Sequence, residues 1–308
     1  MNEYIIGLDI GGTKTVVVVG DFDANIYDKI VFPTEAEREF SYTFEKICKN
    51  VKATIEKFKK IKGISVSIGG PLNIEKGIIY SPPNLPNWKE IHLKELLEDK
   101  FSLPVYIEHD GNAGALAEFL FGNGRGYKNI IFITFGTGLG AGIILDGRIY
   151  RGTTDTAGEI GHIRLSTKGP FAYGKKGSWE SFCSGPGLLR IADYLSPGKF
   201  KTTYYIVKSV KENDRDALKI VKKCAKYFGK GLAILIDVLN PEVIIIGSMA
   251  IRLGDIFLKT AIEEAKKESL PIPFSVCKIT TPYIGEKLGD IASLCAFIYN
   301  VKHYKKLT

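Results

Sequence analysis

The chain has 308 residues, of which 45% are hydrophobic and 25% are charged, and its formal net charge is +8. This is the composition of a globular protein, and the length exceeds what one hydrophobic core usually organises, so we expect two domains or two halves. The sequence lacks an apolar run of the roughly 18 residues that a membrane span needs, and it opens without a cleavable signal pattern. We therefore expect a cytoplasmic protein with no membrane partner.

The positive charge raises the question of nucleic acid binding. The basic residues, however, are spread along amphipathic segments such as Lys46–Lys62 and Lys208–Lys230. This spread is typical of solvated helix faces, and the sequence has no compact basic motif, so we predict no nucleic acid partner. The five cysteines lie far apart without a C-x-x-C pair, which favours reduced thiols over disulfides or a metal knuckle.

The first third of the chain alternates short apolar runs with turns and helical periods. Three strands are predicted at Tyr4–Ile10, Thr15–Gly20 and Ile26–Phe32, and a long amphipathic helix at Glu37–Ile61. The elements predicted after that helix are a strand at Gly63–Ile68, a stiff loop at Pro82–Pro86, a helix at His92–Lys100, a strand at Pro104–Ile107 and a helix at Asn112–Phe121.

The plan of the opening residues recurs at Asn129–Tyr150. An apolar strand, a glycine-rich turn with one threonine, a second apolar strand, an Asp-Gly turn and a third strand follow one another again. Further on, helices at Asp216–Leu239 and Leu253–Ser269 flank a strand at Val243–Ile246. The pattern indicates an internal duplication, and two like halves that face each other leave a cleft in which ligands usually bind.

Each half has a glycine-rich turn after its first strand, at Gly11–Thr13 and at Gly136–Gly140. Without Cβ atoms, backbone N–H groups can converge on an anion, and each threonine adds a hydroxyl donor. Either turn alone is explained equally well as a tight hairpin. Two turns at equivalent places predict a polyphosphate held from both sides, and Asp9, at the end of the first strand, is placed to hold Mg²⁺ directly or through water.

Several motifs occur in an order that resembles the ROK family (repressors, open reading frames, kinases). They are DIGGTKT from Asp9, SPPNLPNW from Ser81, EHDGNAGALAE from Glu108, FGTGLGAG from Phe135, GEIGH from Gly158, NPEVIIIG from Asn240, and residues 289–296. The family's enzymes are ATP-dependent sugar kinases, so the resemblance implies an α/β protein with a duplicated actin-like/ribonuclease H-like ATPase fold and a central cleft. It also implies a small N-terminal domain, residues 1–117 plus 290–308, whose last part is a helix from about Asp290, and a larger C-terminal domain, residues 118–289.

Asp110 is the candidate catalytic residue. An acidic residue followed by glycine, after a buried strand and before a helix, lies at the carboxyl end of a sheet, where active sites collect. An aspartate in this place is also a common helix N-cap, and the residues alone favour that alternative. The resemblance implies that Asp110 is the general base that accepts the proton of the sugar hydroxyl, in a reaction that depends mainly on positioning and charge neutralisation.

The resemblance also implies two sets of binding residues. Those for the sugar are Gly70, Asn84, His109, Asp110, Glu159, His162 and Glu180. Those for ATP and its Mg²⁺ are Asp9, Gly11, Gly12, Thr13, Lys14, Gly136, Thr137, Gly138, Gly247 and Ser248. Carboxylates and amides suit sugar hydroxyls because an analogue that lacks a hydroxyl leaves a buried group unpaired. Taken alone, Asn84 is equally a turn residue and Glu180 a first-turn helix charge.

The sequence departs from the family pattern at its zinc site. The segment FAYGKKGSWE has Phe171, Tyr173 and Ser178 where the family has thiolates. The remaining His162 cannot make a closed tetrahedral site alone, so we predict no zinc. We expect Phe171, Tyr173 and Trp179 to hold this loop by packing, the alternative being a loop ordered by sugar.

Two further departures concern the sugar pocket. His109 stands where the family has asparagine, and Leu72 stands where it has glycine, which we expect to narrow the pocket. The predicted function is transfer of the ATP γ-phosphate to the 6-hydroxyl of a hexose, with glucose expected first and N-acetylmannosamine, N-acetylglucosamine, allose, fructose or mannose as alternatives. The family also implies a homodimer.

Transcriptional repression and sugar sensing are the two other classes of function. The family's repressors carry a helix-turn-helix region ahead of the first phosphate motif, whereas this motif begins here at Leu8, so we do not expect a repressor. A sugar sensor that binds without turnover is the remaining alternative.

Overall fold

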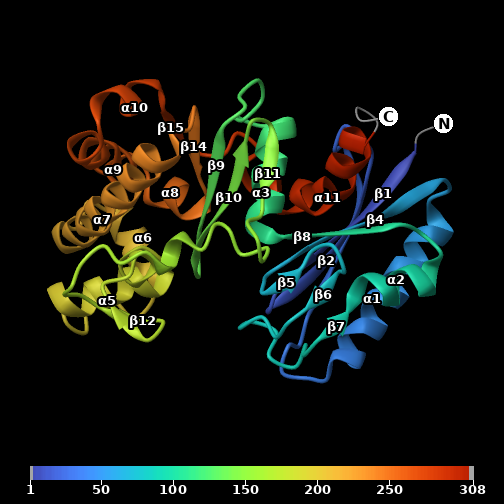
Figure 1. The fold of residues 1–308 in the computed structure, drawn as a ribbon. Helices are drawn as coiled ribbons and strands as arrows, with labels where there is room; N and C mark the ends of the chain where they lie inside the picture. Colours follow the sequence, from blue (N-terminus) through green and yellow to red (C-terminus); the bar gives the residue numbers. More distant parts are fainter. Residues whose placement is uncertain (1–2, 305–308) are drawn as a thin grey trace. The chain divides into compact units, whose positions relative to one another are not determined.

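The computed structural model describes residues 3–304, which fall into two compact units (Figure 1). The first unit comprises residues up to Arg125, Arg151–Ala157 and residues from Ile284 onward. The second unit comprises Gly126–Tyr150 and Gly158–Tyr283. Each unit is of mixed α/β structure and is built on one five-stranded sheet.

The two sheets have the same topology. The strand order is β3-β2-β1-β4-β8 in the first unit and β11-β10-β9-β14-β15 in the second. In both, the first three strands in sequence are antiparallel neighbours, and the last two are added parallel to the first. The internal duplication predicted from the sequence is therefore confirmed.

The first unit holds the N-terminal sheet and its helices. Its elements are β1 (Tyr4–Ile10), β2 (Lys14–Gly20), β3 (Ile26–Pro33), α1 (Phe40–Lys57), β4 (Ile61–Ile68), β5 (Leu72–Asn73), β6 (Ile78–Ile79), β7 (Ile91–His92), α2 (Leu93–Phe101), β8 (Val105–His109), α3 (Asp110–Phe121), η2 (Gly285–Lys287) and α11 (Leu288–Tyr304).

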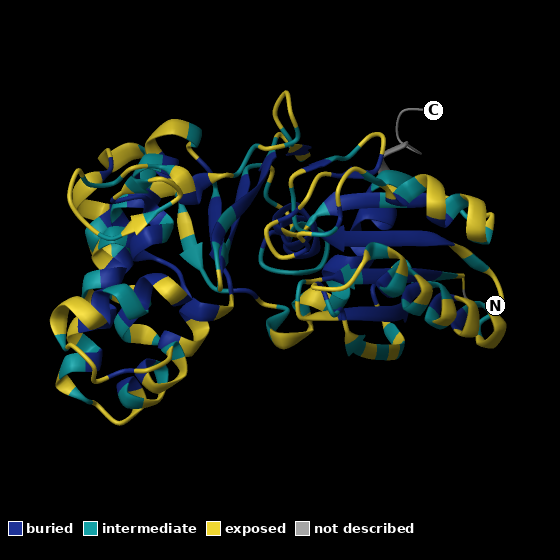
Figure 2. Cartoon of the chain, turned by 90° about the horizontal axis from the view of Figure 1, so that it is seen from below, coloured by how far each residue is buried: buried dark blue, intermediate teal, exposed yellow. Residues whose placement is uncertain are grey.

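Both faces of this sheet are covered. Ile6 and Leu8 of β1 pack with Ile47 of α1, whereas Ile5, on the opposite side of the pleat, packs with Leu294 of α11. Alternate residues of a strand point to opposite faces, so a strand covered on both faces is apolar throughout. Strands β1, β2 and β4 therefore consist mainly of buried residues, which Figure 2 colours dark blue, whereas the edge strand β3 has none.

The second unit repeats this plan and adds helices. Its elements are β9 (Ile130–Phe135), β10 (Leu139–Leu145), β11 (Arg148–Tyr150), η1 (Ile160–His162), β12 (Phe171–Ala172), β13 (Lys175–Lys176), α4 (Trp179–Phe182), α5 (Gly185–Leu195), α6 (Thr203–Lys211), α7 (Arg215–Leu239), β14 (Val243–Ile246), α8 (Ser248–Leu253), α9 (Asp255–Glu268), α10 (Pro271–Val276) and β15 (Lys278–Thr280).

An aromatic cluster forms the centre of the second core. The ring of Phe135 on β9 lies 5.1 Å from that of Phe228 on α7, and Phe228 lies 5.4 Å from Trp179 on α4. A Cβ atom at Gly231 of α7 would come within 2.2 Å of the Trp179 ring. Glycine is thus required there, and the close contact anchors the short helix that carries Glu180.

Most predicted elements agree with the structure within two residues; the helix at Glu37–Ile61 does not, and the start of the helix at Leu253–Ser269 differs by two. The helix predicted at Glu37–Ile61 spans only Phe40–Lys57, because Lys60 adopts a left-handed φ of 64° and β4 begins at Ile61. The helix predicted from Leu253 begins instead at Asp255, because Gly254, with φ of 71°, separates α8 from α9. The apolar period continues across both breaks, so periodicity alone could not reveal them.

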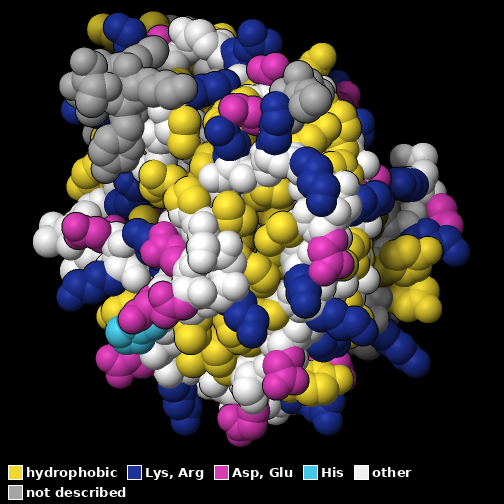
Figure 3. All heavy atoms as spheres, turned by 90° about the vertical axis from the view of Figure 1, so that its right-hand side faces the viewer, with side chains coloured by type: hydrophobic (Ala, Val, Ile, Leu, Met, Phe, Trp, Pro, Cys, Tyr) yellow, Lys and Arg dark blue, Asp and Glu magenta, His cyan; other side chains and the backbone are white. Residues whose placement is uncertain are grey.

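The surface carries charges of both signs. On the face that Figure 3 shows, Lys and Arg side chains are interspersed with Asp and Glu and with apolar side chains. None of the helices within residues 3–304 combines the length and the apolarity that crossing a membrane would require.

Candidate active site

The predicted site residues form two groups, one in each unit. The first unit holds Asp9, the turn at Gly11–Lys14, Gly70, Asn84, His109 and Asp110. The second unit holds the turn at Gly136–Gly138, Glu159, His162, Glu180, Gly247 and Ser248.

Asp9 lies at the carboxyl end of β1 and has an unusual charge equilibrium. Its pKa is raised from 3.8 to about 6, first by burial and then by the charge of Asp110, while Lys14 opposes the shift. The two carboxylates therefore act within one electrostatic site. A half-buried carboxylate beside a second one is a suitable environment for a divalent cation, which would relieve their repulsion, so the donor set fits Mg²⁺.

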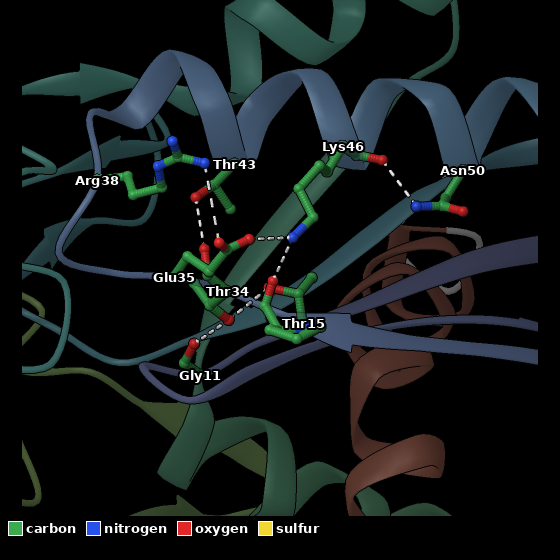
Figure 4. A network of polar contacts seen from close by, with 9 residues as sticks. Gly11, Thr15, Thr34, Glu35, Arg38, Thr43, Lys46 and Asn50 are labelled. Carbon is green, nitrogen blue, oxygen red and sulfur yellow. Dashed lines mark hydrogen bonds and ion pairs between the residues drawn. The ribbon is translucent and has the colours of Figure 1, made fainter.

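A network of threonine hydrogen bonds stabilises the first glycine turn (Figure 4). The buried Thr34 donates its hydroxyl proton to the Gly11 carbonyl at 2.6 Å and contacts the Thr15 hydroxyl at 2.9 Å. The Thr43 hydroxyl in turn donates to the Thr34 carbonyl at 2.7 Å. Sequence reasoning missed Thr34, because a threonine 23 residues away from Gly11 carries no local signal.

The same turn lies against the loop of Asn84. A Cβ atom at Gly12 would come within 2.6 Å of the Asn84 carbonyl oxygen and 2.7 Å of its Cβ. The structure thus brings together a residue predicted for the nucleotide and one predicted for the sugar. The side chain of Asn84 itself is exposed.

Asp110 opens α3 but is not its cap. The N-cap is His109, whose Nδ1 accepts a hydrogen bond from the Gly111 backbone nitrogen at 3.2 Å. The Asp110 carboxylate accepts from the same nitrogen at 2.7 Å, and its side chain is 57% exposed. With the capping position taken by His109, the Asp110 carboxylate is presented to solvent at the carboxyl end of β8.

His109 also borders Gly70 and Leu72. A Cβ atom at Gly70 would lie 3.3 Å from His109 Nε2 and 3.3 Å from Leu72 Cδ2. The Nε2 edge of His109, the Gly70 backbone and the Leu72 side chain therefore share one small region.

A buried ion pair supports the strand end that carries His109 and Asp110. Glu108 is 1% exposed, and its Oε2 accepts from Arg151 Nη2 at 2.6 Å and Nε at 3.1 Å. Its Oε1 accepts from Asn112 Nδ2 at 2.8 Å. Sequence reasoning missed Arg151, which lies 43 residues from its partner.

In the second unit, Glu180 is bonded to the second glycine turn. Its Oε2 accepts a hydrogen bond from the Leu139 backbone nitrogen at 2.8 Å. A Cβ atom at Gly138 would lie 3.1 Å from the same oxygen. The structure therefore joins a predicted nucleotide residue to a predicted sugar residue in this unit as well. Glu159, by contrast, is exposed, and its backbone carbonyl accepts a hydrogen bond from the His162 backbone nitrogen at 3.2 Å.

Tyr173 occupies one of the family's cysteine positions and contacts two site residues. Its ring centroid lies 4.8 Å from that of His162. Burial and a hydrogen bond to Glu180 raise its pKa to about 12. Trp179 is fully buried as expected, but Phe171 is 61% exposed, so the expectation that Phe171 packs beneath the loop is wrong.

Nothing within residues 3–304 forms a group of three or more His, Cys, Asp or Glu side chains that could hold a metal ion. All five cysteines are free, and Cys183 is buried with its Sγ 3.4 Å from the Cys224 carbonyl oxygen. Ser178, at another thiolate position, instead caps α4 by accepting from the Ser181 nitrogen.

A cavity of about 530 Å³ gathers the remaining nucleotide candidates. Gly136 and Thr137 line it together with Ser248, the first residue of α8. Gly247 is not a lining residue, because it packs so closely on β9 that a Cβ would lie 2.9 Å from the Ile133 carbonyl oxygen. Sequence reasoning missed four polar or cationic lining residues, namely Lys201, Thr202, Thr203 and Arg252.

Known proteins resemble this chain along almost its whole length. A sequence model of the ROK family matches residues 5–293. The glucokinase of Halalkalibacterium halodurans is 32% identical over 310 residues, covering 94% of this chain and 93% of that protein. The xylose repressor of Caldicellulosiruptor bescii is 30% identical over 320 residues, covering 97% of this chain and 80% of that protein.

Solved structures show the same relationship. The ROK hexokinase from Thermus thermophilus has a TM-score of 0.86 at 27% identity, covering 97% of this chain and 99% of the other. A ROK family glucokinase from Streptomyces griseus, solved with glucose and AMPPNP, has a TM-score of 0.80 at 26% identity, covering 94% and 98%. The similar proteins thus include both enzymes and a repressor.

Proposed function

The chain belongs to the ROK family and has its duplicated actin-like fold, and we propose that it is an ATP-dependent kinase that phosphorylates the 6-hydroxyl of a hexose. The observation that carries the proposal is the exposed carboxylate of Asp110, which is not used as the N-cap of α3. Its charge raises the pKa of Asp9, the residue that precedes the first glycine turn. A repressor needs no general base beside its phosphate turn.

In the proposed reaction Asp110 orients the 6-hydroxyl and accepts its proton as the oxygen attacks the γ-phosphorus. The bond from that phosphorus to the bridging oxygen of ADP breaks, and ADP leaves with the electron pair. Asp9 would hold Mg²⁺, which supplies positive charge to the phosphates. The backbone of the two glycine turns, with Thr13, Lys14 and Thr137, donates to the phosphate oxygens.

We propose glucose as the first candidate substrate, because the relative of 32% identity that covers nearly the whole chain is a glucokinase. Sugar contacts are assigned to Gly70, Asn84, His109, Glu159, His162 and Glu180. Leu72 narrows the pocket relative to the family pattern, and His109 changes the hydrogen-bonding groups that line it. N-acetylmannosamine, N-acetylglucosamine, allose, fructose and mannose are therefore the alternative substrates. We further propose a cytoplasmic homodimer without structural zinc.

A second candidate function is sugar sensing without turnover. Two observations favour it: the Tyr173 hydroxyl engages Glu180, and a xylose repressor shares 30% identity along the chain. In such a protein the sugar residues would bind while Asp110 stayed idle.

A coupled ADP-release assay decides between the two. Mg-ATP is supplied with glucose and with each alternative sugar, for the native chain, for Asp110→Asn and for Asp99→Asn, an exposed aspartate of α2 that serves as control. We expect turnover on one or more sugars, abolished in Asp110→Asn only. Sugar binding by calorimetry without any turnover would instead establish the sensor.

A further inference from the structure

The second unit contains a cavity of about 650 Å³ that the proposed reaction does not use. It is bounded by the segment around β12, by α5 and by α7 (Figure 1). One wall is a pair of stacked rings, Phe182 and Tyr227, whose centroids lie 3.6 Å apart at an angle of 7°. Phe182 is 2% exposed, so the half-buried ring of Tyr227 is the aromatic surface that a ligand can reach.

Three cations and one carboxylate line the same cavity. They are Lys168, Arg190, Lys223 and Asp193. Within residues 3–304 the ion pairs of this region use other lysines, such as Lys199 and Lys230. Lys223 instead lies with Nζ 5.0 Å from the ring centroid of Tyr194, which is 77% exposed. Lys168, Arg190 and Lys223 can therefore bind an anionic ligand in this cavity.

An adjoining cavity of about 500 Å³ increases the positive potential. It shares Lys223 and Tyr227 with the first and is otherwise lined by Lys219, Lys222, Lys226, Lys230 and Glu264. Together the two cavities are lined by seven cations and two carboxylates, and one of the cations, Lys230, is paired with Glu268 outside the lining. The lysines of α7, which the sequence interpretation placed on a solvated helix face, therefore join Lys168 and Arg190 in one strongly positive groove.

We propose that the larger cavity binds a phosphorylated small molecule whose ring packs on Tyr227 while Lys168, Arg190 and Lys223 hold the phosphate. Arginine and lysine are the usual phosphate-binding side chains, and the arginine fork can engage two oxygens at once. Glucose 6-phosphate has this chemistry, because its hydroxyls lie mostly around the edge of the ring and its axial C–H groups give the ring an apolar face. The assignment of a hexose phosphate as the natural ligand rests on the proposed function.

The cavity is built on the segment that leads to Glu180. A Cβ at Gly169 would lie 2.3 Å from the Phe182 ring, so the backbone before β12 rests directly on the aromatic wall. The hairpin that follows carries Tyr173, whose ring centroid lies 4.8 Å from that of His162. The cavity therefore adjoins the hairpin that contacts the proposed sugar residues.

Calorimetric titration tests the site without turnover. Glucose 6-phosphate, ADP and inorganic phosphate are each titrated into the native chain, Lys223→Ala, Arg190→Ala and the control Lys226→Ala, which removes an equal charge from α7 outside the larger cavity. We expect a binding event that Lys223→Ala and Arg190→Ala each weaken about tenfold, as loss of a charge-assisted contact does. Lys226→Ala should change it less than about twofold, because exposed charges are screened.

The arms identify the ligand and separate this proposal from the kinase. Binding of glucose 6-phosphate that persists in Asp110→Asn and depends on Lys223 and Arg190 supports the site even if no sugar is phosphorylated. Tighter binding of ADP with the same dependence keeps the site and assigns it to a nucleotide. Affinities that are equal in all four proteins, or inorganic phosphate that binds as tightly as both esters, would overturn the proposal. Thermal unfolding of each variant confirms that its fold is intact.

Discussion

Arg151 donates two hydrogen bonds to one carboxylate oxygen of Glu108, at 2.6 Å from Nη2 and 3.1 Å from Nε. The pair is nearly inaccessible at the Glu108 end, and Glu108 lies two positions before Asp110. The other oxygen of Glu108 bonds to Asn112, two positions after Asp110. The backbone on both sides of the proposed base is therefore fixed by one charged group.

We predict that Arg151→Ala lowers both stability and turnover. Removing one partner of a buried ion pair leaves an unpaired charge and costs about 3 kcal/mol. Urea unfolding measures this loss, and steady-state kinetics should show kcat falling more than KM rises. Arg125→Ala, an exposed arginine in the same unit, is the control.

A double variant distinguishes a role of Arg151 in positioning Asp110 from a general loss of stability. In Arg151→Ala/Glu108→Gln the buried charge is gone, so part of the stability should return while kcat stays low. If kcat recovered together with stability, Arg151 would have no positioning role.

A second prediction concerns pH. Asp9 has its folded-state pKa raised from 3.8 to about 6, so its ionisation destabilises the metal-free fold fully above pH 6, and the penalty fades as the pH falls toward 3.8. Asp9→Asn should therefore stabilise the metal-free protein at pH 8 by about 3 kcal/mol, with a smaller gain at pH 5, while abolishing activity. Denaturant unfolding at both pH values tests the sign. A destabilised Asp9→Asn at pH 8 would contradict it.

The sequence predicts the main architecture because the duplication is written in local patterns. The glycine turns, the apolar runs of β1 and β9 and the helix after Asp110 each depend on neighbouring residues, and the structure has them where they were expected. What the sequence does not reveal are the contacts between distant residues. Thr34 with Gly11, and Arg151 with Glu108, are separated by 23 and 43 residues, and no period connects them.

The segment of the altered zinc motif was the hardest to predict. Three aromatic residues there were equally plausible as packing groups, and only their side-chain directions distinguish them. Trp179 enters the core over Gly231, Phe171 faces solvent, and Tyr173 turns to His162 with a left-handed φ of 52°. Side-chain direction in a two-residue strand is set by tertiary contacts, which composition does not encode.

A third prediction concerns the support of the first phosphate turn. Thr34→Val preserves the shape of the side chain but removes its bonds to Gly11 and Thr15, so the turn should loosen and KM for ATP should rise several-fold with little change in kcat. The buried hydroxyl is lost at a cost of about 1 kcal/mol. Thr54→Val, which removes a comparable bond to the Asn50 carbonyl within α1, is the matched control. Equal kinetics in the two variants would show that the network does not act on the nucleotide.

The last prediction tests whether Tyr173 stabilises the loop in which the family pattern has a zinc site. Tyr173→Phe keeps the ring against His162 and removes only the hydroxyl that bonds to Glu180. Because Glu180 also holds the Leu139 nitrogen of the second glycine turn at 2.8 Å, the freed carboxylate should shift and KM for the sugar should rise about fivefold.

The neighbouring Phe171→Ala, at an exposed position in the same hairpin, should leave KM unchanged. Neither variant should bind zinc, and metal analysis of both purified proteins checks that a bound metal is not the cause of a change in KM. A KM for sugar that stays constant in Tyr173→Phe would mean that the Tyr173 hydroxyl does not position Glu180.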